Sequence, residues 1–168
     1  DSTPQVARID AHLLNRQGVA RLCYCGPVLH TLPASPQASR EPLQFGAEIY
    51  GHAGLEADLE ILTLALDTLT AADVVGSTID FADARIVHAL LAQSGLAASQ
   101  FAAVYQALAA KDAQALADAT ATAPPDVAAG LAALMQLYGE STVLADARAR
   151  LPAMPLIAEA LDDLAWLA

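Results

Sequence analysis

The stretch Arg40–Gly51 reads REPLQFGAEIYG, and its apolar and polar side chains alternate with a period of two. This alternation predicts a β-strand with two unlike faces. One face would be ordinary core and carry Leu43, Phe45, Ala47 and Ile49. The other face would carry Gln44, Gly46 and Glu48 in one line. Glycine inside a strand often marks the close approach of a ligand or another backbone. The strand is therefore either the floor of a polar small-molecule pocket or a strand whose polar face is simply solvated.

The whole chain is long and apolar enough for a real core. Its 168 residues, 55% of them hydrophobic, fit one domain or a core with a small subdomain. Aromatic residues make up only 5%, which favours packed helices over a β-sandwich. No apolar run approaches the roughly 18 residues that cross a bilayer, so no membrane contact is expected. The first residue is Asp rather than Met and no signal-peptide pattern follows, so we expect a cytoplasmic piece of a larger protein.

The net charge of −11 is unevenly distributed. Residues 1–54 are balanced, whereas the remainder holds four basic residues against 15 acidic ones, and Lys111 is the only lysine. Phosphate backbones are bound by clustered Lys and Arg, so this composition argues against a nucleic-acid partner. An acidic surface is better suited to solubility or to a basic protein partner.

No motif for metal or cofactor binding is evident. Cys23 and Cys25 form a C-x-C pair with no further cysteine, which is a weak metal signal, and we predict two small buried side chains in a reduced compartment. The four histidines are scattered without metal-ligand spacing. Phosphate-loop, dinucleotide and nucleophile-elbow motifs are absent from the sequence. We therefore predict no metal, no cofactor and no catalytic residues.

The expected elements divide the chain near residue 82. Ser2 as a hydroxyl cap and Pro4 predict a helix to about residue 15, and strands are predicted at 19–29, 40–51 and 77–81. The loop 30–39 is longer than a hairpin needs, as in loops that close over ligands. A helix is predicted at 55–72. Only helices follow, at 83–93, 97–110, 111–120, 124–139, from 141 to about 151, and at 156–168. This order is typical of an α+β piece followed by an Ala-rich helical piece.

One group of side chains has the chemistry of a ligand-binding site. Glu48 on a pocket floor can bind an ammonium group, and Arg40 at the strand entrance can hold a carboxylate bidentately. Gln44 can donate and accept. Together the three side chains suit a zwitterion, that is, a free amino acid.

Two parts of the sequence resemble a known family. Residues 21–28, the loop after them and residues 40–51 resemble motif 2 of class II aminoacyl-tRNA synthetases, in the version found in histidyl-tRNA synthetase. Residues 1–8 (DSTPQVAR) and 8–14 (RIDAHLL) resemble one branch of it, the synthetase-like regulatory subunit of ATP phosphoribosyltransferase, the first enzyme of histidine biosynthesis. The resemblance implies a partial class II synthetase-like core at 1–81, an all-helical insertion at 82–150 and a returning helix at 151–168. It places motif 1 before Asp1 and motif 3 after Ala168.

The resemblance also implies a histidine site. The acid and threonine that contact histidine in the family match Asp1 and Thr3. The motif 2 arginine matches Arg40, and the glutamine and glutamate that hold the amino acid match Gln44 and Glu48. His30 stands where a synthetase has its ATP-gripping arginine. An imidazole cannot replace the bidentate phosphate contact of a guanidinium, so the sequence favours the non-catalytic branch.

The function implied is that of a regulatory subunit without catalysis of its own. It would bind and activate the short-form catalytic subunit of ATP phosphoribosyltransferase and mediate feedback by histidine, as part of an oligomer. Two alternatives stay open. One is a histidyl-tRNA synthetase, and the other is a helical interaction module in which the strands are only scaffold.

Overall fold

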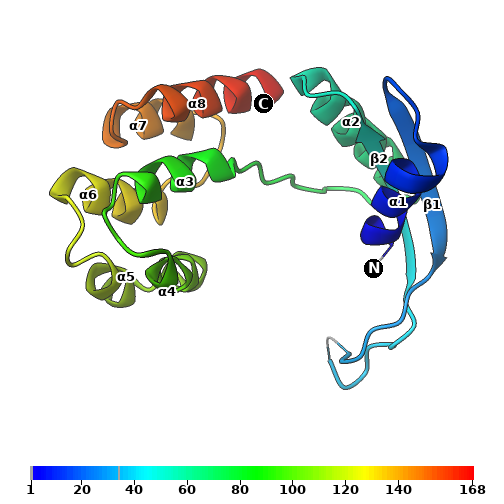
Figure 1. The fold of residues 1–168 in the computed structure, drawn as a ribbon, viewed down its shortest axis with the longest axis horizontal. Coiled ribbons are helices and arrows are strands. Elements are labelled where there is room, and N and C mark those ends of the chain that lie inside the picture. The colour runs from blue at the N-terminus through cyan, green and yellow to red at the C-terminus, as the bar shows by residue number, and fades with distance from the viewer. Residues whose placement is uncertain (1, 34) are drawn as a thin grey trace. The chain divides into compact units, whose positions relative to one another are not determined.

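The structure is a computed structural model that describes residues 2–33 and 35–168 (Figure 1). The chain divides into two compact units, Asp1–Ser77 and Thr78–Ala168. The first contains a β-hairpin and three helical segments, and the second contains only helices. The α+β class predicted from the sequence is confirmed.

The hairpin of the first unit joins β1 (Ala20–Pro27) to β2 (Leu43–Tyr50). The strands are antiparallel, and their register runs from Ala20 opposite Tyr50 to Pro27 opposite Leu43. Two backbone hydrogen bonds continue the pairing into the connecting loop, from the Val28 amide to the Pro42 carbonyl and from the His30 amide to the Arg40 carbonyl. Because side chains alternate along each strand, this register also fixes which residues share a face.

The two faces of the hairpin differ from the sequence prediction. The half-buried face carries Gln44, Gly46 and Glu48, which is the polar line of the alternation. On the other face, which was predicted to be core, Leu43 is 69% and Phe45 62% exposed. Cys23 and Cys25 lie on this second face and are exposed, so the prediction that they are buried is wrong.

Helix α2 (Leu55–Ala71) explains why that face is covered only in part. It contacts β2, and Glu60 accepts hydrogen bonds from Arg21 Nε at 2.5 Å and from the Arg21 terminal nitrogen at 2.7 Å. Ala47 and Ile49, near this bridge, are half-buried. None of the side chains of α2 is fully buried, and Leu59 and Leu66 remain about 40% exposed.

The N-terminal helical segment is α1 (Thr3–Ile9) followed by a π-helical turn, η1 (Asp10–Leu14). Its extent agrees with the prediction, and it ends at Asn15, whose φ of 41° is left-handed. The predicted cap is wrong, because the Ser2 side chain makes no capping hydrogen bond. The Ser2 backbone amide instead donates to the side chain of Gln44 on β2. The start of α1 is thereby attached to the polar face of the hairpin.

The strand predicted at 77–81 is not formed. The sheet of the described residues contains only β1 and β2, so no strand edge pairs with this segment. A short extended stretch without a partner leaves its backbone groups to water. Among the described residues, no helix is both long and apolar enough to cross a membrane.

The second unit contains six helices, and five of the six predicted helices agree with them to within a few residues at both ends. The helix predicted at 124–139 is shorter and ends at Leu134. The six are α3 (Ala84–Ala92), α4 (Ala98–Ala110), α5 (Ala113–Ala119), α6 (Pro125–Leu134), α7 (Val143–Arg150) and α8 (Pro155–Leu167). Helix α3 contacts both α6 and α8, and α7 contacts α8. Helix α8 therefore lies in the same compact unit as α3 to α7.

The buried core of the described residues lies almost wholly in this second unit. Its fully buried side chains include Leu90, Val104, Leu116 and Leu131, whereas Val6 is the one buried hydrophobic residue in the described part of the first unit. Gly130 on α6 allows close packing, because a Cβ there would lie 2.9 Å from Pro152 Cδ and 3.0 Å from Leu90 Cδ2.

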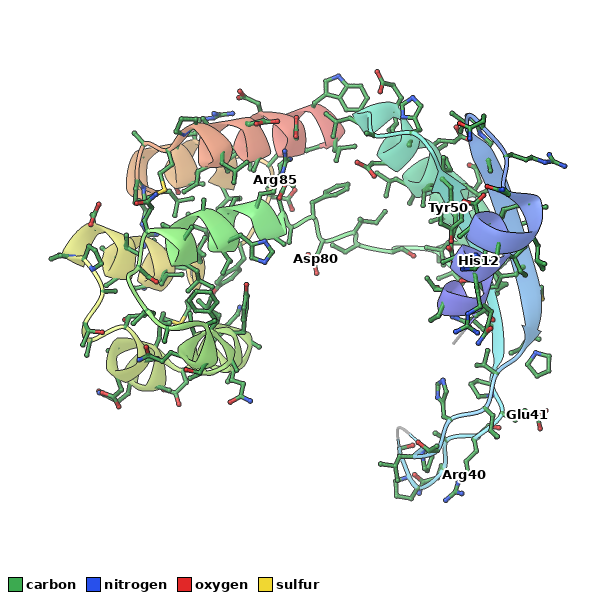
Figure 2. All side chains as sticks on the ribbon, in the orientation of Figure 1. His12, Arg40, Glu41, Tyr50, Asp80 and Arg85 are labelled. Carbon is green, nitrogen blue, oxygen red and sulfur yellow. The ribbon has the colours of Figure 1, made fainter. Side chains whose placement is uncertain are left out.

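All four basic side chains of the second unit contact groups of the same unit. Arg85 on α3 binds Asp83 at 2.6 Å and also binds Asp163 on α8 (Figure 2). Arg148 binds Asp162 at 2.6 Å, and Arg150 donates to Gln136 at 2.8 Å. The Lys111 ammonium lies 4.0 Å from the centre of the Tyr138 ring.

Candidate functional site

The polar face of β2 brings part of the predicted site together. Gln44 and Glu48 lie on the same half-buried face of the strand. Thr3, on α1, is connected to this face through Tyr24. Arg40 lies elsewhere, since it is exposed in the hairpin loop at the end remote from Tyr50 (Figure 2). Asp1 lies outside the described residues. The assignment of these five residues to a histidine site stays a prediction.

Gln44 marks one end of the polar line. Its Oε1 accepts a hydrogen bond from the Ser2 backbone amide at 2.9 Å. That amide belongs to the first turn of α1, where backbone donors have no partner within the helix. The amide side chain of Gln44 therefore fixes the beginning of α1 over the strand and places Thr3 beside the site.

Gly46, the middle of the line, makes room for a side chain. The Tyr24 ring lies over it, and a Cβ at position 46 would lie 2.6 Å from the Tyr24 hydroxyl oxygen. The same hydroxyl lies 3.2 Å from Thr3 Oγ1. The sequence led us to expect a ligand or backbone at this glycine, whereas the structure places an aromatic ring there. Tyr24 was missed because only the hairpin register sets it opposite Gly46.

The two carboxylate oxygens of Glu48, at the other end, differ in their hydrogen bonding. Oε2 accepts a hydrogen bond from the Tyr50 hydroxyl, whereas Oε1 is buried and has no hydrogen-bond partner among the described residues. Leu22 lies opposite Glu48 in the register and supplies no donor. A buried charged acceptor without a donor is costly, by about 1–3 kcal/mol or more. The arrangement is thus suited to a ligand that brings an N–H group.

Tyr50 is the second residue that the sequence analysis missed. The hydrogen bond to Glu48, aided by desolvation and by the negative charges of Glu48 and Asp10, raises the pKa of Tyr50 to about 12. The phenol therefore keeps its proton and remains a donor at neutral pH. The period-two pattern, continued from Glu48 by one more step, would have placed Tyr50 on the same face.

The spacing of the site indicates how a ligand would lie. Four residues of strand separate the Cα atoms of Gln44 and Glu48 by about 13 Å. A small molecule that reaches both side chains must lie lengthwise along β2, past the Tyr24 ring. The side chains at the two ends, Gln44 and Glu48, are polar, and the middle is formed by the Tyr24 ring and the Gly46 backbone. This arrangement suits a ligand with a polar group at each end.

A separate hollow lies where β2 begins. It has a volume of about 280 Å³ and is lined mainly by apolar groups, together with His30 and Gln44. His30 is the residue that stands in place of the synthetase arginine. The described residues contain no group of three or more His, Cys, Asp or Glu side chains that could hold a metal ion.

Comparisons with known proteins identify the family. The family model described as histidyl-tRNA synthetase matches residues 1–168. The chain is 62% identical to the ATP phosphoribosyltransferase regulatory subunit of Albidiferax ferrireducens and 59% identical to that of Verminephrobacter eiseniae, in both cases over 100% of this chain and 44% of the relative. The chain belongs to the histidyl-tRNA synthetase family.

Within that family, the resemblance to the regulatory-subunit branch is confirmed by these relatives, which carry that name along the full chain. The chain spans 44% of their length. A solved structure described as an ATP phosphoribosyltransferase regulatory subunit/histidyl-tRNA synthetase from Bacillus halodurans has the same fold, with a TM-score of 0.83 at 22% identity. That match covers 99% of this chain and 44% of the other. The partial class II synthetase-like core is thereby confirmed.

Proposed function

We propose that the protein containing this chain is a regulatory subunit of ATP phosphoribosyltransferase, acting in histidine biosynthesis in the cytoplasm. It has no catalytic activity of its own. It binds and activates the short-form catalytic subunit as part of an oligomer, and it carries histidine feedback to it. The names of relatives up to 62% identical support the role in this complex.

The observation that supports a histidine site is the carboxylate of Glu48. Its Oε1 is buried without a donor among the described residues, while Oε2 is already held by Tyr50. Histidine carries N–H donors at both its ammonium and its imidazole. Gln44 and Glu48 supply polar partners along one strand face and Thr3 supplies one from α1. Asp1 and Arg40 complete the proposed set.

Two features support a regulatory role over amino-acid activation. His30 stands where a synthetase would hold the α-phosphate of ATP with an arginine, and an imidazole cannot make the bidentate phosphate contact of a guanidinium. The basic side chains of Thr78–Ala168 are engaged within that unit, so it offers little positive charge to a tRNA backbone.

Feedback through this site requires a difference in affinity. Histidine shifts the complex between an active and an inhibited form only if it binds one form more tightly than the other. In this proposal histidine binds on β2 beside the start of α1, so a change in the position of α1 relative to the hairpin would alter the polar groups that face the ligand.

The experiment is a calorimetric titration of the full-length protein with histidine. We expect wild-type protein to bind and Glu48→Ala and Gln44→Ala to lose roughly tenfold or more in affinity, since each removes a polar contact. Ala47→Ser, on the opposite face of the same strand, is the matched control and should bind as wild type. Equal binding by wild type and both site variants would refute the site.

A second assay separates regulation from synthetase activity. Histidine-dependent pyrophosphate exchange by the full-length protein is expected to be absent, and its presence would favour a histidyl-tRNA synthetase. Addition of the purified short-form catalytic subunit should give phosphoribosyl transfer that histidine inhibits. A catalytic subunit whose rate does not change on addition of this protein would contradict the regulatory role.

A further inference from the structure

Glu48 is held from one side only. Its Oε2 accepts the Tyr50 hydroxyl, and its Oε1 is buried and accepts nothing from the described residues. A carboxylate fixed at one oxygen presents the other in a set direction. Tyr50 thus determines where the free acceptor points.

The backbone places the two residues of this pair on one face of β2. Glu48 and Tyr50 lie two residues apart on β2, so their side chains share a face. Both residues are paired with β1, Glu48 with Leu22 and Tyr50 with Ala20. Neither of these partners has a side-chain donor, whereas the Tyr50 hydroxyl donates a hydrogen bond to Glu48.

We propose that Tyr50 is a positioning residue for the ligand: it orients Glu48 so that Oε1 accepts one N–H of the bound histidine. This inference rests on the proposed function and names the residue that sets the geometry of that same site. Tyr50 acts through Glu48 and does not itself touch histidine. A phenylalanine at this position keeps the ring but leaves the carboxylate free to rotate or to turn toward solvent.

The charge state of Tyr50 agrees with this role. Its raised pKa keeps the phenol protonated over the whole physiological range, so it donates steadily. Orientation of this kind lowers the entropy that the carboxylate loses when the ligand binds, which is how a supporting residue contributes to affinity.

The test is a double-mutant cycle on the full-length protein, with histidine affinity measured by calorimetry. Tyr50→Phe should weaken histidine binding roughly tenfold. In a Glu48→Ala background the same change should alter affinity less than about twofold, because residues that act through one another are not additive. Tyr138→Phe, which removes an exposed hydroxyl of the other unit, is the matched control and should leave affinity unchanged.

The outcomes separate this inference from the proposed function. If wild-type protein does not bind histidine, both fail. If it binds and Tyr50→Phe binds equally well, the positioning role is overturned while the histidine site stands. If the effects of Tyr50→Phe and Glu48→Ala add, Tyr50 acts independently of Glu48 and the inference is also overturned.

A second measurement does not depend on whether a Tyr50 variant folds. In wild-type protein labelled with ¹³C at tyrosine Cζ, saturation with histidine should shift the resonance of the Tyr50 phenol, because a new donor at Oε1 withdraws charge from Oε2. In Glu48→Gln protein this shift should be lost. A Tyr50 resonance that does not respond to bound histidine in wild type overturns the inference.

Discussion

Gly46 shows how one residue decides the shape of the site. The hydrogen at this position lets the Tyr24 ring lie over β2 and reach Thr3 on α1. Any larger residue must displace the ring. The glycine therefore links the strand to α1 through the Tyr24 side chain.

Gly46→Ala should weaken the attachment of α1. The new Cβ would meet the Tyr24 ring at 2.6–3.1 Å, so the ring must move and its contact with Thr3 must lengthen. We expect a loss of stability of about 1–3 kcal/mol, as for overpacked sites, and faster hydrogen exchange in α1. Gly26→Ala is the matched control, since a Cβ at Gly26 on the same face meets nothing within 4 Å. Equal effects of the two substitutions would contradict the role of Tyr24.

Tyr50 should titrate apart from the other tyrosines. The folded-state pKa of about 12 lies above the ordinary value near 10. The stability that this hydrogen bond contributes is therefore fully present below pH 10 and is lost as the pH rises from 10 to 12. NMR of ¹³Cζ-labelled tyrosine at pH 11 should show Tyr50 still protonated, and Glu48→Gln should lower its pKa toward 10. A Tyr50 midpoint near 10 in wild type would count against the hydrogen bond.

At the scale of elements, the packing of α6 against α3 depends on Gly130. Alanine is the better helix former by about 1 kcal/mol. At this site, however, its methyl group would lie 2.9 Å from the half-buried Pro152 and 3.0 Å from Leu90, which is fully buried in the core. We expect Gly130→Ala to lower the free energy of unfolding by about 1–3 kcal/mol in chemical denaturation. An increase of about 1 kcal/mol in the free energy of unfolding would mean that the core accommodates the methyl group without strain.

The ion pairs of Arg85, at the start of α3, should make the second unit sensitive to acid. Hydrogen bonds from Arg85 hold the pKa of Asp83 below its ordinary value. The stability gained from Asp83 is thus present above that ordinary value, near 4, and is lost as the pH falls through the lowered one. Arg85→Gln should reduce the melting temperature at pH 7, and the difference from wild type should shrink toward pH 2.

The matched control for Arg85 is Arg148→Gln. Arg148 joins α7 to α8 through Asp162, and this pair is more exposed to solvent, at 42% and 70%. Exposed ion pairs contribute little to stability. We expect almost no change in melting temperature at either pH. A loss as large as that of Arg85→Gln would show that burial does not distinguish the two pairs.

The elements were predicted well where the signal was local and less well where it depended on neighbours. Gly and Pro set most of the helix ends, and the period of two found β2. The faces of the hairpin were harder, because Phe45 and Cys25 are apolar by composition yet no described element covers them. Residues 77–81 include side chains that are common in strands, but neither strand of the described residues pairs with them. Tyr24 entered the site only through the register of β1 with β2.

At the scale of the whole molecule, burial is distributed unequally between the two units. Among the described residues, nearly every buried hydrophobic side chain belongs to Thr78–Ala168, while Val6 is the one that belongs to the first unit. A two-stranded hairpin is marginally stable by itself. In hydrogen-exchange mass spectrometry of the 168-residue chain, peptides from α3, α6 and α8 should exchange slowly and those from β1, β2 and α2 quickly. Equal protection across both units would contradict this difference in stability.

The internal pairing of Arg85, Lys111, Arg148 and Arg150 has a consequence for encounters in solution. The second unit displays carboxylates whose field is not offset by freely extended cations, so approaching positive surfaces are drawn in over roughly one Debye length, about 8 Å at physiological ionic strength. Association with a basic protein should therefore slow markedly as salt is added, while dissociation changes little. The chain would then find such a partner by long-range attraction and retain it through short-range contacts.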